Sequence, residues 1–238
     1  MSGHSHWAGI KHKKGLQDAK RGKVFTKFGK LITIAARDGG GGNPDANFQL
    51  RLAIERARSV NMPKENIERA IKRGTGELKG AEIEELVYEG MGPGGVMMII
   101  KSMTDNRNRA VSEIKTLLTK SGGKMGEKGS SMWNFDSVGI IYADLEGKDP
   151  DEIELVAIDA GAKDTKLEDG SLLIFTEPDK LNSIRENVVA NGIKVLEASL
   201  GYLPKTIAEI DADTRLDYEK LLETLDDHDD VDEIYDNL

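Results

Sequence analysis

The chain contains no cysteine and only four histidines among its 238 residues. Without cysteine there are no disulfides, no thiolate nucleophiles and no cysteine-ligated zinc. His4, His6 and His12 lie near the start and His228 near the end, so a histidine-based acid, base or triad would depend on the two ends of the chain. We therefore predict a protein that is not an enzyme, with no catalytic residues, no metal site and no cofactor.

Long apolar runs are also absent, because the longest, residues 96–100, has the length of a strand. A membrane span needs about 20 apolar residues. The first residues lack the apolar core of a secretory signal, and their many lysines fit a transit peptide poorly. We expect a cytoplasmic protein with no membrane partner. The absence of a heptad repeat favours a monomer.

Charge is divided unevenly along the chain, whose total is −9. Residues 1–79 carry 17 Lys/Arg and 7 Asp/Glu, a net +10, whereas residues 80–238 carry 16 and 35, a net −19. The excess is greatest in residues 2–30, which hold eight basic residues and one acid, Asp18. This stretch either binds a polyanion or packs against the acidic half of the chain. Trp7, Phe25 and Phe28 among the lysines favour a nucleic acid, bound mainly through its phosphates.

Three helices are predicted in this basic region. After an arm over residues 1–14, residues 16–37 place an apolar stripe and a lysine stripe on different sides of one helix, and Gly22 and Gly29 mark a third, narrow face. Asn43 is the expected N-cap of a second helix. A third helix is expected over residues 64–73. We predict a basic helical nucleic-acid-binding domain over residues 1–79.

The remaining sequence alternates strands and helices. Strands are predicted at 84–89, 96–103, 132–135, 139–145, 163–168, 171–176, 194–203, 206–210 and 231–235, and helices at 106–120, 150–160, 178–191 and 214–225. This order predicts an α+β protein with two ferredoxin-like α/β sandwich domains. One would be built from residues 80–129 together with 205–238, and the other, residues 130–204, would be inserted in it.

Three further motifs carry alternatives. Gly90-x-Gly92-x-x-Gly95 has the spacing of a dinucleotide fingerprint, but a strand follows it, so we interpret it as a hairpin. Residues 226–233 are dense in carboxylates, which favours a solvated acidic edge over a cation site because the EF-hand pattern is missing. Arg107 and Arg109 lie at a predicted helix start, where the local residues either cap the helix or form a secondary anion site.

The candidate nucleic-acid contacts are the basic residues of the arm and of the outward helix faces. They are Lys11, His12, Lys13, Lys14, Lys20, Arg21, Lys23, Lys27, Lys30, Arg37, Arg51, Arg58, Lys72 and Arg73.

Several short motifs spread over nearly the whole chain resemble those of the YebC family. They are residues 2–7 (SGHSHW) with 10–12 (IKH), 39–44 (GGGGNP), 61–63 (NMP), 88–90 (YEG) with 92–94 (GPG), 105–109 (DNRNR) and 129–135 (GSSMWNF). The resemblance implies three domains, an N-terminal helical one and two nested α/β ones, in a cytoplasmic protein without enzymatic activity. Bacterial members are labelled DNA-binding transcriptional regulators, and the resemblance implies this role for the protein. Mitochondrial relatives resemble activators of translation, which implies an alternative role on the ribosome, with rRNA or tRNA as partner, assisting elongation at sequences such as proline runs.

Overall fold

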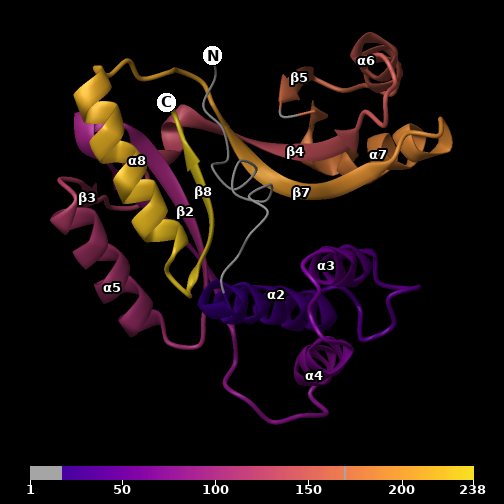
Figure 1. Ribbon diagram of the computed structural model, residues 1–238, viewed down its shortest axis with the longest axis horizontal. Helices are drawn as coiled ribbons and strands as arrows, with labels where there is room; N and C mark the ends of the chain where they lie inside the picture. Colours follow the sequence, from indigo (N-terminus) through magenta and orange to yellow (C-terminus); the bar gives the residue numbers. More distant parts are fainter. Residues whose placement is uncertain (1–17, 169) are drawn as a thin grey trace. The chain divides into compact units, whose positions relative to one another are not determined.

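The computed structural model describes residues 18–168 and 170–238. The protein is α+β and divides into two compact units, one formed by the chain up to Asn134 together with Thr206–Leu238, the other by Phe135–Lys205 (Figure 1). The first unit contains a helical domain and a four-stranded sheet. The second unit contains the other four-stranded sheet.

The helical domain consists of α2 (Asp18–Asp38), α3 (Phe48–Ser59) and α4 (Lys64–Gly74). Its core joins Phe28 and Ile32 of α2 to the apolar faces of the other two helices. α4 contacts α2 at Gly74, where an added Cβ would clash with the Thr33 carbonyl oxygen and the Ala36 side chain. Glycine is required there because any side chain would push the two helices apart.

The predicted start of the second helix is wrong. Asn43 lies in a turn, and the N-cap is Asn47, whose Oδ1 accepts the Leu50 N–H at 3.0 Å. The Asn47 amide also donates to the carbonyl oxygens of Ala35 and Gly41. These contacts with α2 and with the loop over residues 39–42 decide which asparagine caps the helix. They come from tertiary packing and cannot be inferred from the local sequence.

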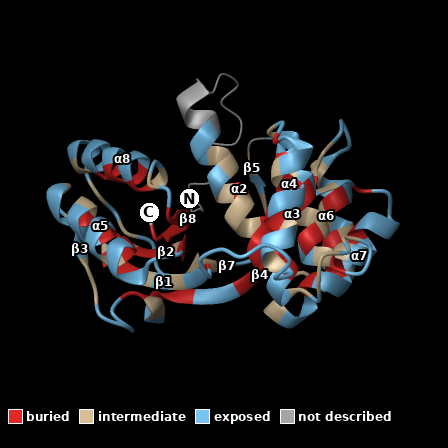
Figure 2. Ribbon diagram, turned by 90° about the horizontal axis from the view of Figure 1, so that it is seen from below, coloured by how far each residue is buried: buried red, intermediate tan, exposed pale blue. Residues whose placement is uncertain are grey.

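The first sheet has the order β3-β1-β2-β8, with every neighbouring pair antiparallel. Its strands are β1 (Glu84–Met91), β2 (Met97–Thr104), β3 (Lys124–Met125) and β8 (Val231–Asp236). α5 (Arg107–Lys120) and α8 (Ala212–Asp226) lie beside this sheet (Figure 1) and share its principal apolar core. Ile34 of α2 packs with Ile83 and Met103, so β2 is buried over most of its length (Figure 2).

The motif Gly90-x-Gly92-x-x-Gly95 forms the β1–β2 hairpin, as predicted, with Pro93–Gly95 as a 3-10 turn.

The second unit runs β4 (Phe135–Asp144), α6 (Pro150–Asp159), β5 (Asp164–Glu168), β6 (Ser171–Thr176), α7 (Leu181–Ala190) and β7 (Val195–Pro204). Its sheet order, β5-β6-β4-β7, together with the βαββαβ chain order defines a ferredoxin-like sandwich. The first sheet has the same spatial pattern, but β1, which occupies the position of the third strand, comes first along the chain.

Two strand predictions are wrong. Residues 132–134 form a 3-10 turn, and one continuous strand, β4, replaces the predicted pair because both β6 and β7 pair along it. Residues 206–210 form no strand. Thr206 instead bonds to the Asn134 side chain, and the Ala208 N–H donates to the Asn237 carbonyl oxygen at 2.6 Å. The outer edge of the first sheet is supplied by β3, which at two residues is too short for a periodic pattern to reveal.

Candidate nucleic-acid interface

Three lysines of α2 contact the acidic segment, which we define as Asp226–Asp230 between α8 and β8. Lys23 Nζ donates to the Asp227 carbonyl oxygen at 2.9 Å. Lys27 donates to the carbonyl oxygen of Asp226 and forms an ion pair with its carboxylate at 3.4 Å. The last carbonyl groups of a helix carry partial negative charge, so the end of α8 attracts these cations even apart from its carboxylates.

Lys30 makes the most buried of these contacts. Its ammonium group donates to the Met103 and Asp229 carbonyl oxygens, each at 2.9 Å, and to the Asp230 carboxylate. The Lys30 and Asp230 side chains are only 13% and 2% exposed. Burial alone would raise the pKa of Asp230, but the hydrogen bonds from Lys30 and Arg109 outweigh it and hold the pKa below its ordinary value. The ionised pair therefore joins α2 to the β8 end of the sheet.

These contacts bear on the two interpretations of the basic stretch. One interpretation was binding of a polyanion and the other was packing against the acidic half of the chain. The described lysines of α2 follow the second. The prediction of a solvated acidic edge is wrong for Asp230, Asp232 and Glu233, which are at most 6% exposed. They are buried because β8 pairs with β2 and the segment before it receives the α2 lysines.

A second charged cluster lies on β2 and β8. Lys101 Nζ and the Tyr235 hydroxyl both donate to Glu233, at 2.8 and 2.7 Å. Burial raises the pKa of Glu233, but Lys101 and Arg56 outweigh it and bring the pKa to about 2. Burial, reinforced by the Glu233 charge, raises the pKa of Asp232 to about 7. Asp232 Oδ1 is buried without a hydrogen-bond partner.

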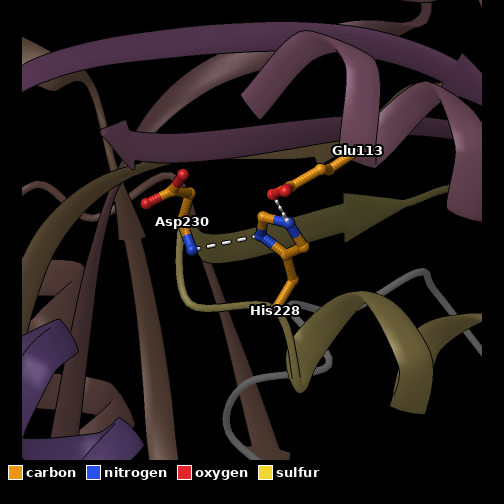
Figure 3. A group of neighbouring side chains, drawn as sticks. All are labelled: Glu113, His228 and Asp230. Carbon is orange, nitrogen blue, oxygen red and sulfur yellow. Dashed lines mark hydrogen bonds and ion pairs between the residues drawn. The ribbon is translucent and has the colours of Figure 1, made fainter. Parts of the chain in front are cut away.

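Glu113, His228 and Asp230 bring one imidazole nitrogen and two carboxylate oxygens within 4.8 Å, as a metal site would (Figure 3). The imidazole is already engaged, because Nδ1 accepts the Asp230 N–H at 3.1 Å and Nε2 lies 2.9 Å from Glu113. This network assigns the proton to Nε2. The Asp230 carboxylate accepts from Lys30, Thr104 and Arg109. The donor set is thus satisfied by hydrogen bonds and fits a metal ion poorly.

At the start of α5, where the sequence leaves helix capping and a secondary anion site as alternatives, Asn106 and Arg109 are engaged within the fold. Asn106 caps the helix by accepting the Arg109 N–H at 3.1 Å. The Arg109 guanidinium donates to Asp105 at 2.9 Å and to Asp230 at 2.8 Å. Arg107 is exposed. Arg109 therefore serves to hold the acidic segment.

The remaining candidate residues fall into three groups. Lys11, His12, Lys13 and Lys14 lie outside the described residues, as do His4 and His6, and the side chains of Lys20 and Arg21 are not described. Arg37 pairs with Asp38 and donates to the Ile83 carbonyl oxygen.

The outward cations form the third group: Arg51, Arg58, Lys72 and Arg73, to which the structure adds Arg69. Over the residues that the structure describes, none of the five forms an ion pair with a carboxylate. The Arg51 guanidinium lies 5.5 Å from the centre of the Phe48 ring.

A groove between α2 and α4 was not predicted. Its lining includes Asn66, Arg69 and Arg73 of α4 and both glycines of α2. The spacing of the three polar residues, i, i+3 and i+7, was the signal that could have grouped them on one helix face. Their position opposite the α2 glycines required the packing of the two helices.

The fold and these surfaces define a class: an α+β protein of two ferredoxin-like sandwiches carrying a cationic three-helix domain. Residues 5–77 match the family model described as the TACO1/YebC protein N-terminal domain, and residues 83–238 match the model of the TACO1/YebC second and third domain. The chain therefore belongs to the TACO1/YebC family.

Curated relatives are similar in sequence over the full length of this chain. A "Probable transcriptional regulatory protein" of Halothermothrix orenii is 49% identical over all of this chain and 94% of its own length. A protein of the same name from Herpetosiphon aurantiacus is 50% identical, with the same coverage. The crystal structure of a conserved hypothetical protein from Aquifex aeolicus superposes with a TM-score of 0.88 at 42% identity, covering 98% of this chain and 96% of that one. No described helix has the length and apolar character needed to cross a membrane.

Proposed function

We propose that this protein regulates gene expression by binding nucleic acid through its N-terminal helical domain. The observation that carries the proposal is the outward set of cations on α3 and α4, which no described carboxylate neutralises. Lysines held by the acidic segment serve the fold, whereas unpaired arginines remain available to phosphate. Such contacts position a nucleic acid without reading its sequence.

The names of the relatives support DNA and transcription as the setting. One structural observation favours the alternative, a factor that acts on rRNA or tRNA in translation. α2 is the longest helix of the domain, and its lysine face packs against the acidic segment. A helix used in this way is poorly placed to enter a major groove and read bases. Contact through arginines on short helices suits the irregular phosphate surface of a structured RNA.

The test compares two variants that remove two positive charges each. The α3 variant, Arg51→Ala with Arg58→Ala, removes outward cations of the helical domain. The control variant, Lys115→Ala with Lys120→Ala, removes two exposed lysines of α5. Binding to a labelled DNA duplex and to a labelled structured RNA is measured by fluorescence anisotropy at several salt concentrations.

We expect the α3 variant to lose affinity and the control variant to keep it. Loss of two phosphate contacts should make the log–log dependence of duplex affinity on salt shallower by about 1.8. If both variants bound with the affinity of the wild type, Arg51 and Arg58 of α3 would not contact the nucleic acid. Crosslinking in cells followed by sequencing then separates the two settings, since enrichment at promoters supports transcription and enrichment on rRNA or tRNA supports translation.

A further inference from the structure

The groove between α2 and α4 has a volume of about 570 Å³. That size lies within the range of about 300–1,000 Å³ found for ligand sites. On its α2 side, Gly22, Phe25 and Gly29 recur on one helix face. Met62, at the turn before α4, lines it as well. Thr26, Lys30 and Thr33 of α2 line it too, so the α2 side combines the Phe25 ring and bare backbone with polar groups.

The opposite side of the groove is cationic. Arg69 and Arg73 are exposed, one helical turn apart, which separates them by about 6 Å along α4. Neither has an ion-pair partner among the described residues. Asn66, on the same face, makes no side-chain hydrogen bond to a described residue. Within this lining the one carboxylate is Asp105, which Arg109 already neutralises at 2.9 Å.

Glycine at position 22 has no local structural requirement. A Cβ added there would meet no atom of a described residue within 4 Å, and its φ is not positive. Glycine in a helix costs about 1 kcal/mol relative to alanine. The residue therefore weakens α2, and the space that it leaves is part of the groove.

We propose that the α2–α4 groove binds a single strand of nucleic acid. Arg69 and Arg73 contact successive phosphates, the Phe25 ring supplies a surface for base stacking, and Asn66 bonds a base edge. A duplex presents its phosphates on a convex cylinder, which a groove between two helices does not match. A single strand can lay its backbone along α4 and turn its bases toward α2. This inference rests on the proposed nucleic-acid binding and narrows it to one strand at one site.

The experiment measures anisotropy of labelled U12, labelled dT12 and a labelled 12-base-pair DNA duplex. The groove variants are Arg69→Ala with Arg73→Ala, and Gly22→Leu, which fills the groove. The control is again Lys115→Ala with Lys120→Ala. For the arginine variant we expect weaker single-strand binding and a salt slope shallower by about 1.4. For Gly22→Leu we expect at least a tenfold loss of single-strand affinity together with an unfolding temperature raised by about 2–4 °C.

A Gly22→Leu variant with a higher unfolding temperature and a lower affinity has an intact fold. Its loss of binding is then due to a blocked groove. Wild-type affinity for U12 and dT12 in both groove variants would overturn the inference. If the α3 variant alone then loses binding, the proposed function stands without this groove. If the wild type binds none of the three probes, both proposals fail. If polyglutamate displaced U12 as readily as unlabelled U12 does, the groove would be assigned to an acidic protein. That result would also overturn the inference of a single-strand site.

Discussion

Lys30 shows how a residue with the sequence character of a phosphate contact comes to serve the fold. It lies in a lysine stripe, yet its ammonium group donates hydrogen bonds to three oxygen atoms of β2 and the acidic segment. Its counterpart Asp230 is buried and would be costly to leave unpaired. Replacing Lys23, Lys27 or Lys30 by glutamate would therefore place like charges together and disturb the packing of α2. Nucleic-acid binding is better tested at the outward cations.

Removal of the Lys30 ammonium group tests this contact. We expect Lys30→Met to lower the free energy of unfolding by about 2–3 kcal/mol, because among the described residues Asp230 then keeps only Arg109 and Thr104 as side-chain donors. Urea denaturation measures the loss. Lys64→Met, which breaks an exposed pair with Glu68, should cost no more than about 0.5 kcal/mol. Equal effects would mean that the Lys30 contacts contribute little.

The pH dependence of the same variant follows from the lowered pKa of Asp230. A carboxyl group with a lowered folded-state pKa stabilises the protein above its unfolded pKa, and this contribution disappears as the pH falls through the folded value. Without Lys30 the folded pKa of Asp230 should rise. The acid loss of stability should then become smaller for Lys30→Met than for the wild type.

The pKa of Asp232 is shifted in the opposite direction from that of Asp230. Its pKa is raised to about 7, from an unfolded value near 4, first by burial and then by Glu233. Between these two values the folded state holds a proton that the unfolded state has lost, so this group makes stability fall as the pH rises from about 4 to 7.

We therefore expect Asp232→Asn to unfold at a higher temperature than the wild type at pH 8, and to show a smaller difference at pH 5. Thermal denaturation at the two pH values measures this. Asp213→Asn, at an exposed residue in the first turn of α8, is the control. A loss of stability at pH 8 would show that the Asp232 charge is needed by its cationic neighbours.

At the scale of elements, one buried carboxylate organises the loop that leaves the first sheet. Glu89 on β1 accepts the N–H groups of Gly129, Ser131 and Met132 at 2.6–2.8 Å. Burial raises the pKa of Glu89, but these three bonds outweigh it and lower the pKa. Trp133, which follows them, is 58% exposed. The loop is thus held from within while its tryptophan faces solvent.

Glu89→Gln should lower the free energy of unfolding by about 1–3 kcal/mol, because an amide cannot accept all three bonds. Hydrogen exchange at Gly129, Ser131 and Met132 should accelerate. The wild-type contribution is present above about pH 4.5 and disappears as the pH falls through the lowered value, so the difference between the two proteins should shrink in acid. Glu127→Gln changes an exposed residue of the same loop and should leave exchange unaltered.

At the scale of the whole molecule, the second unit is an insertion whose two ends meet. Phe135 and Pro204 are paired across β4 and β7. Just outside them, Asn134 bonds Thr206 through its side-chain oxygen at 3.1 Å and through its amide at 3.0 Å. Each unit also has its own core. Such a connection lets either unit fold without the other.

Replacing residues 135–205 by two glycines should therefore leave a protein that unfolds cooperatively, and residues 135–205 alone should also fold. Circular dichroism during heating and a dispersed NMR spectrum of each piece provide the measurement. An unfolded remainder would mean that the insertion supports the first sheet. In that case changing Asn134 alone should be nearly as damaging as the deletion.

Sequence periodicity and turn chemistry by themselves determined the α+β class, the nested sandwiches and most helices and strands, since both signals act over a few residues. They also revealed a charge division strong enough to define two possible partners for the basic stretch. Tertiary structure alone selected Asn47 over Asn43 as the cap, made β4 continuous, supplied β3 and placed the acidic segment on the α2 lysines. Each of these depends on contacts between residues far apart in the chain, up to 204 positions for Lys23 and Asp227. A local pattern records how much charge a segment carries, but only packing decides which charges neutralise one another and which remain for a ligand.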